Sequence, residues 1–262
     1  MGEENIIYDD GQLKLEVIAP IAEKVQINGM EQYALRWFAD GDVGKTKNGH
    51  SVVIMAHIGK LKILLGGDLN SHSADFIMSQ YGGEDLGQLK IQLTKAKTDN
   101  EKNVLQQKID QLIGTCRKTM GCDVAKSCHH GSHDITNELL KAFNPIATVI
   151  SSGDEESFCH PRPETLGAIG KYSRGDRPLI FSTELSRSSP EYFTLKMLKI
   201  KTPAEKQRLV STYGMIALRS DGLNTIIVQK LEKETSRFGK LVKWQIDKLI
   251  WNDKRGEIIS KS

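Results

Sequence analysis

Short apolar runs alternate with amphipathic runs between residues 51 and 182, and this alternation constrains the fold more than any other feature of the sequence. The apolar runs are β-branched or leucine-rich and predict strands at 51–57, 60–65, 123–128, 146–151 and 178–181. Helical spacing predicts helices at 137–143 and 163–172. Strands that alternate with helices predict a layered α/β domain, and a chain of 262 residues has room for one main core.

The flanking segments extend this domain. Residues 13–19 alternate and stop at Pro20, which predicts a strand, whereas residues 28–48 are irregular and predict little regular structure. Ser220-Asp221-Gly222 predicts a hairpin turn, and the basic tail with Trp244 and Trp251 predicts a further strand or helix. We expect a main domain over residues 1–200, with residues 201–262 packed on it as a hairpin and extension.

Residues 84–120 differ from their surroundings. Leucines and isoleucines recur at helical spacing among dense mixed charge, with a break at Thr98-Asp99-Asn100. We expect an inserted helical hairpin that projects from the domain. It is either a solvated insertion or a docking surface.

Composition restricts the class of protein. Hydrophobic residues make up 39% of the chain and charged residues 26%, and no stretch approaches the ~20 apolar residues of a membrane helix, so we expect a soluble protein without membrane contact. The first residues do not resemble a secretory signal, and the four cysteines form no C-x-x-C pair, which favours reduced thiols and a cytoplasmic location. A net charge of +3 neither favours nor excludes a nucleic-acid partner.

Asp68 is the first candidate for chemistry. It follows the strand predicted at 60–65, in the sequence Gly66-Gly67-Asp68, and ligands of α/β proteins gather where strands leave the sheet. Asp68 is therefore a candidate metal-bridging carboxylate. The alternative is that it caps the short helix expected after it.

Histidines supply the other candidates. His129, His130 and His133 fall within five positions after a predicted strand, and imidazole is a common ligand of zinc-class metals. At least one is expected to bind metal; the alternative is capping or backbone hydrogen bonding. His160 is held among prolines, which suits a proton-transfer residue or a surface loop, and His72 is a remote further candidate.

Four segments taken in order resemble one branch of the metallo-β-lactamase superfamily, the branch with the hydrolase domain of competence-type DNA-uptake proteins. They are Asn-Gly-His-Ser-Val-Val at 48–53, Leu-Leu-Gly-Gly-Asp at 64–68, His-His-Gly-Ser at 129–132 and His-Pro-Arg-Pro-Glu at 160–164. The similarity spans roughly residues 13–185, and the His-His-Gly-Ser element is its most specific part.

The resemblance implies an αββα sandwich with two metal ions, zinc or manganese, that activate a water to attack a phosphodiester or another ester-like bond. By this resemblance Asp68 and His129 are metal ligands. His130 supports the site beside them, and His160 matches a histidine on the leaving-group side, so these two are the predicted catalytic residues.

The chain departs from the family pattern in its first part. Members carry a His-x-His-x-Asp-His element, or a variant with Asp at the second His, well before the carboxylate, and residues 1–67 contain neither. The chain thus resembles mainly the C-terminal half of the fold, with a weak or partial metal site. Such a half would expose an apolar sheet face, at a cost of ~25 cal/mol per Å², so we expect a missing N-terminal half, a partner chain or an oligomer.

Three explanations fit this departure: a piece of a longer protein, a second chain that completes the site, or a fold that has lost its chemistry. Two functions follow. The first is a metal-dependent hydrolase that acts on phosphodiester or nucleic-acid substrates. The second is a non-catalytic interaction module that uses the 84–118 hairpin and the basic tail.

Overall fold

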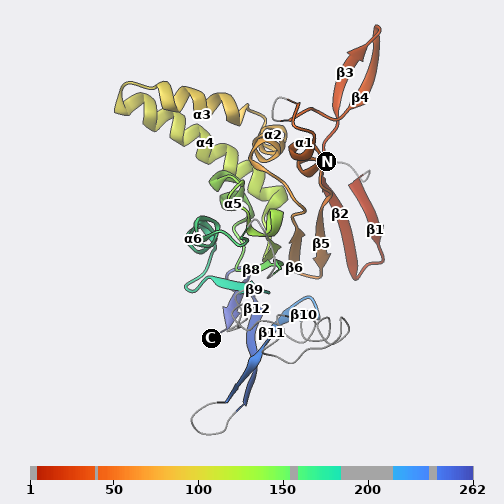
Figure 1. The fold of residues 1–262 in the computed structure, drawn as a ribbon, viewed down its shortest axis with the longest axis vertical. Helices are drawn as coiled ribbons and strands as arrows, with labels where there is room; N and C mark the ends of the chain where they lie inside the picture. Colours follow the sequence, from red (N-terminus) through yellow and green to blue (C-terminus); the bar gives the residue numbers. More distant parts are fainter. Residues whose placement is uncertain (1–4, 39–40, 154–158, 184–214, 236–240, 262) are drawn as a thin grey trace, which may run out of the picture.

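A mixed sheet forms the centre of the molecule (Figure 1). The computed structural model describes residues 5–38, 41–153, 159–183, 215–235 and 241–261. Within these ranges seven strands pair in the order β1-β2-β5-β6-β7-β8-β9. They are β1 (Ile6–Asp9), β2 (Leu13–Ala19), β5 (Val53–Ile58), β6 (Leu61–Leu65), β7 (Val124–Lys126), β8 (Ala147–Ile150) and β9 (Leu179–Ser182). Neighbours pair antiparallel from β1 to β6 and parallel from β6 to β9, so the predicted α/β class is confirmed.

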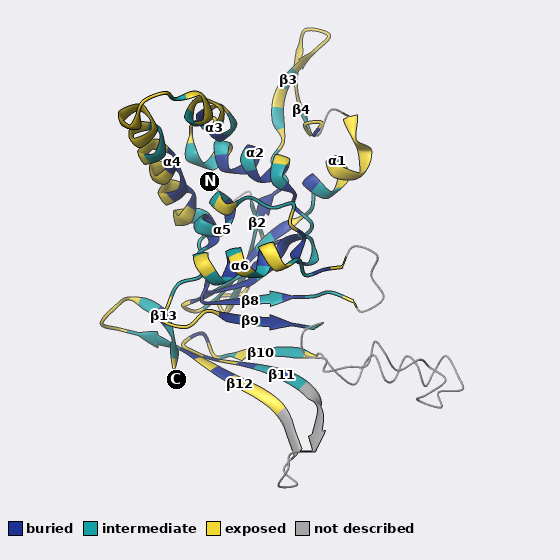
Figure 2. Ribbon diagram, turned by 60° about the vertical axis from the view of Figure 1, so that its left-hand side comes forward, coloured by how far each residue is buried: buried dark blue, intermediate teal, exposed yellow. Residues whose placement is uncertain are grey.

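Helices cover one face of this sheet (Figure 2). They are α2 (Ser71–Gly82), α3 (Leu86–Lys95), α4 (Asp99–Met120), α5 (Asn137–Phe143) and α6 (Pro163–Tyr172). Met55 and Leu64 on the strands are fully buried in one apolar cluster with Met78, Leu86 and Leu139 from the helices. The sequence therefore places its apolar helix stripes against the alternating apolar residues of the strands.

A second sheet covers the other face of β6 to β9. Its strands, in the described ranges, are β10 (Ile216–Ser220), β11 (Asn224–Thr235), β12 (Leu241–Asn252) and β13 (Glu257–Lys261), all antiparallel. Ile227 and Leu249 from this sheet are fully buried against Phe181 and Leu61 of the main sheet. The expectation of an exposed apolar sheet face was thus wrong for β6 to β9, because the C-terminal strands remove that surface from water.

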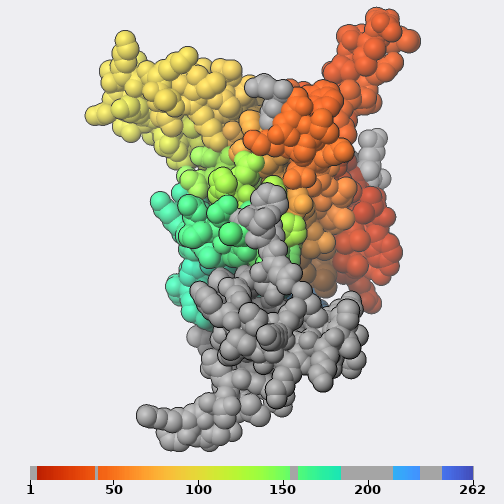
Figure 3. Space-filling view, in the orientation of Figure 1, coloured from red at the N-terminus to blue at the C-terminus, as the bar shows by residue number. Residues whose placement is uncertain are grey.

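The insertion at 84–120 is helical, as predicted, and consists of α3 and α4. Its outer part projects from the molecule (Figure 3). Its inner part packs in the main core, where four residues of α4 are buried: Ile109, Leu112, Ile113 and Cys116. A Cβ on Gly82 of α2 would come within 2.4 Å of the Leu112 side chain, so the two helices touch closely. The hairpin thus projects in its outer part, as expected, whereas its inner part packs in the main core.

The expectation of little regular structure at 28–48 was also wrong. β3 (Glu23–Ile27) and β4 (Met30–Ala34) form a hairpin around Asn28-Gly29, where both residues have positive φ. Asn-Gly is the strongest short signal for such a two-residue turn. α1 (Val43–Gly49) follows, and the Asp42 carboxylate caps it by accepting from the Lys45 N–H at 3.0 Å.

Across the described segments, no helix combines the length and the apolar character that a membrane crossing requires.

Candidate functional site

The candidate residues meet at the carboxyl ends of the parallel strands. Asp68 follows β6, His129 and His130 follow β7, and Ser151 follows β8. Because parallel strands end at the same edge of a sheet, these loops come together, as ligand sites of α/β proteins do. The topology therefore gathers residues that lie up to 83 positions apart in the chain.

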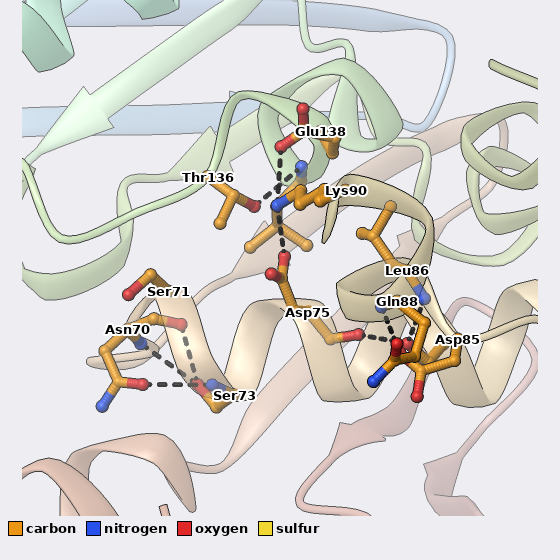
Figure 4. Close-up of polar contacts among 12 residues, drawn as sticks. Asn70, Ser71, Ser73, Asp75, Asp85, Leu86, Gln88, Lys90, Thr136 and Glu138 are labelled. Atoms are coloured by element: carbon orange, nitrogen blue, oxygen red, sulfur yellow. Dashed lines mark hydrogen bonds and ion pairs between the residues drawn. The ribbon is translucent and has the colours of Figure 1, made fainter. Parts of the chain in front are cut away.

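Asp68 does not cap the following helix. The cap of α2 is Asn70, whose side chain accepts from the Ser73 N–H at 3.1 Å, while the Ser73 hydroxyl accepts from the Asn70 N–H at 3.1 Å (Figure 4). The Asp68 N–H donates to the Ser51 hydroxyl at 3.0 Å, and the Asp68 side chain keeps 36% of its surface exposed. The capping alternative is therefore wrong, and the carboxylate instead approaches Lys126 and His130.

The two histidines lie in a left-handed turn. φ is 46° at His129, 53° at His130 and 83° at Gly131, a conformation that non-glycine residues adopt rarely. The His129 N–H donates to the Gly67 carbonyl at 2.9 Å, and the Gly131 carbonyl accepts from the Arg162 N–H at 2.9 Å. Strained backbone of this kind persists when its surroundings fix it, and it concentrates at functional sites.

His130 is the histidine that approaches Asp68. Its Nδ1 lies 2.7 Å from the Ser151 carbonyl, and because a carbonyl only accepts, Nδ1 carries a proton. In the neutral ring Nε2 then bears a lone pair, and it lies 3.5 Å from Asp68 Oδ1. A proton on Nε2, or a cation that both groups bind, would stabilise this contact.

His129 and His160 form a second pair. Their ring centroids are 5.9 Å apart in an edge-to-face arrangement. His129 Nδ1 is buried and has no hydrogen-bond partner in the described part of the chain. His160 is only 8% exposed, so the alternative of a surface-loop histidine is wrong. The predicted ligand His129 therefore lies beside His160, and His130 lies beside Asp68.

Lys126, which the sequence analysis missed, also belongs to this site. Its Nζ lies 3.9 Å from Asp68 Oδ1 and donates to the Gly67 carbonyl at 3.2 Å. The only sequence signal is its place at the end of β7, directly before the histidine segment. Its ammonium partly neutralises the carboxylate.

Two further histidines were candidates. His133 is exposed, and His72 lines a separate cleft along α2. Cys128 is buried against Gly66, and burial raises the pKa of its thiol to about 12, so it is a packing residue rather than a nucleophile.

Among the side chains that the structure describes, no group of three or more His, Cys, Asp or Glu residues is placed to hold a metal ion. Comparison of the chain with protein-family models, with curated proteins and with solved structures gives no match.

Proposed function

We propose that this chain contributes one side of a metal-dependent hydrolytic site of metallo-β-lactamase type, with a phosphodiester or nucleic acid as substrate. The observation that carries the proposal is the pairing of His130 Nε2 with Asp68 Oδ1 while His130 Nδ1 is bound to a backbone carbonyl. Histidines that ligate metals almost always donate their other ring N–H in this way, since the bond fixes the tautomer and the orientation of the ring.

The donors fit a zinc-class or manganese ion. Carboxylate oxygen and imidazole nitrogen bind such metals at about 2.0–2.2 Å, so two ligands of one ion lie roughly 3–3.5 Å apart, as Asp68 Oδ1 and His130 Nε2 do at 3.5 Å. Such an ion, when bound, supplies a Lewis acid that lowers the pKa of water. His130 thus takes the ligand role that the family resemblance gives to His129.

Two donors do not complete a site for one ion, still less for the two ions of the family. Catalytic zinc has three protein ligands and an open position, so in this proposal further ligands come from outside the described residues, whether from the rest of this chain, from a preceding half-domain or from a partner chain. Lys126 weakens binding further, because its ammonium repels a cation held by Asp68. We therefore propose weak metal binding by this chain alone.

The other residues of the site have roles that need no bound metal. The Ser151 carbonyl and the left-handed turn orient the His130 ring toward Asp68. The ring centroids of His129 and His160 are 5.9 Å apart. In the proposal this pair lines the side of the site where the leaving group departs, and an imidazole there is suited to hold a proton.

Titration of the metal-stripped chain with Zn²⁺ and with Mn²⁺, followed by calorimetry, tests the proposal. We expect Asp68→Asn and His130→Gln each to weaken binding by about 10–100-fold, as loss of a metal-site residue does. His133→Gln is the matched control, because His133 is exposed on the same loop. Equal affinity in all four proteins, or no binding at millimolar metal, contradicts the proposal.

A non-catalytic interaction module is the second candidate, and one observation favours it. The β3–β4 hairpin and the segment after it expose large apolar side chains: Met30 is 61%, Tyr33 72% and Trp37 65% exposed. The hairpin stands out from the body of the molecule (Figure 3). Three large apolar side chains exposed within eight residues favour an interaction surface on this segment. If the titration above detects no metal binding, the interaction module becomes the favoured function.

A further inference from the structure

A cleft of about 430 Å³ lies at the edge of the main sheet opposite the candidate metal site. It opens at the amino-terminal ends of β6 and β7, where Lys60, Lys62 and Asp123 lie, whereas Asp68 follows the carboxyl end of β6. Five residues of β6 separate the two edges, which corresponds to ~17 Å along the strand. The two sites are therefore distinct.

Cationic side chains converge on this cleft from separate elements. Lys60 and Lys62 come from the β5–β6 turn and β6, Arg117 comes from α4, and Arg174 follows α6. The Arg174 guanidinium already has partners within the protein. It pairs with Asp123 and donates to the carbonyls of Cys122 and Asn144 at 2.6 and 2.8 Å.

The other three cations have no acidic partner among the described residues. Among the side chains described, no carboxylate lies within 4.0 Å of Lys60, Lys62 or Arg117, and Glu257 is the one other acidic residue that lines the cleft. The excess of positive charge in a concave site favours an anionic ligand.

Two of these groups are held in place. Arg117 Nε and Nη2 donate to the Lys141 carbonyl at 3.2 and 2.7 Å, which fixes the plane of the guanidinium. Lys60 Nζ lies 5.3 Å from the ring centroid of Trp251, and the Trp251 indole N–H donates to Asp253 at 2.9 Å. Donors held before binding lose less entropy when a ligand arrives.

We propose that this cleft binds the phosphate group of a small phosphorylated ligand. Lysine and arginine are the residues that bind phosphate by charge-assisted hydrogen bonds, and the cleft has the volume of a small-molecule site. Trp251 lines the cleft beside the cations, so a ring carried by the ligand, as in a nucleotide, would lie next to the indole. This inference does not depend on the proposed hydrolase.

Calorimetric titration of the full chain with AMP, inorganic phosphate and adenosine tests it. We expect AMP and phosphate to bind in competition and adenosine to bind at least tenfold more weakly than AMP. Lys62→Gln and Arg117→Gln are each expected to weaken AMP binding at least tenfold, because each removes a charge-assisted hydrogen bond. Lys62→Arg keeps the charge and should retain most of the affinity.

Two controls separate this site from other surfaces. Lys102→Gln changes an exposed lysine on the outer part of the same helix as Arg117, and Asp68→Asn changes the metal site; both should bind AMP as the unmodified chain does. The inference is overturned if AMP and phosphate give no binding at millimolar concentration. It is also overturned if Lys62→Gln and Arg117→Gln, with unchanged melting temperatures, bind AMP normally, or if Asp68→Asn abolishes binding.

Discussion

Gly131 offers a quantitative test of how the histidine turn is held. Its φ of +83° lies in the left-handed region, and a Cβ added there would lie 2.7 Å from Pro161 Cβ and 3.2 Å from Ile150 Cγ2. An L side chain in this region costs about 1–2 kcal/mol, and overpacking a tight site costs about 1–3 kcal/mol more. Gly131→Ala should therefore lower the free energy of unfolding by about 2–5 kcal/mol.

Urea unfolding and thermal melting measure this cost. For a chain of this size each kcal/mol corresponds to roughly 2–4 °C, so the melting temperature should fall by about 4–20 °C. Gly167→Ala is the matched control: Gly167 lies on α6 with nothing within 4 Å of an added Cβ, and alanine should stabilise the helix by about 0.5–1 kcal/mol. If Gly131→Ala is as stable as the unmodified chain, the steric account of the turn is refuted.

Three further predictions concern stability and reactivity. Arg174→Ala should cost about 3–5 kcal/mol in urea unfolding, because the Asp123 carboxylate, with 9% of its side chain exposed, loses its charge partner; a cost under about 1 kcal/mol would contradict this. Burial lowers the pKa of His57 below its ordinary value, so stability should fall as the pH drops below roughly 6.5, the unfolded value. His57→Gln should flatten that dependence in urea midpoints at pH 7 and 5, and an unchanged slope would count against it. Burial raises the pKa of the Cys116 thiol to about 11 and that of Cys128 to about 12, and raises that of Cys122 as well, which leaves few thiolates at pH 8. A disulfide reagent should therefore titrate the exposed Cys159 rapidly in the native chain and four thiols in denaturant; several fast native thiols would contradict the buried positions.

Local pattern accounts for the elements that the sequence determined. The helices at 137–143 and 163–172 and the strand at 13–19 have the predicted bounds, because side-chain periodicity and end residues report the local backbone directly. The β3–β4 hairpin was also encoded locally, by Asn28-Gly29, although the spacing of the nearby glycines had predicted irregular structure in this region. Clustered histidines after a strand pointed to the region of the candidate site.

Tertiary structure decided how these pieces meet. An apolar pattern shows that a face is covered but does not identify what covers it. The sequence predicted that residues 201–262 pack on the main domain, but not that β10–β13 cover β6–β9 or that α4 packs on α2. The contact between His130 and Asp68 was likewise not encoded locally. Left-handed backbone in the turn, together with the Gly67 and Ser151 carbonyls on neighbouring strand ends, directs His130 to Asp68 and places Lys126 beside it. Such partners come together only when the parallel strands pair. Hydrogen bonds between distant segments leave no periodic pattern in the sequence, so the sequence did not predict them.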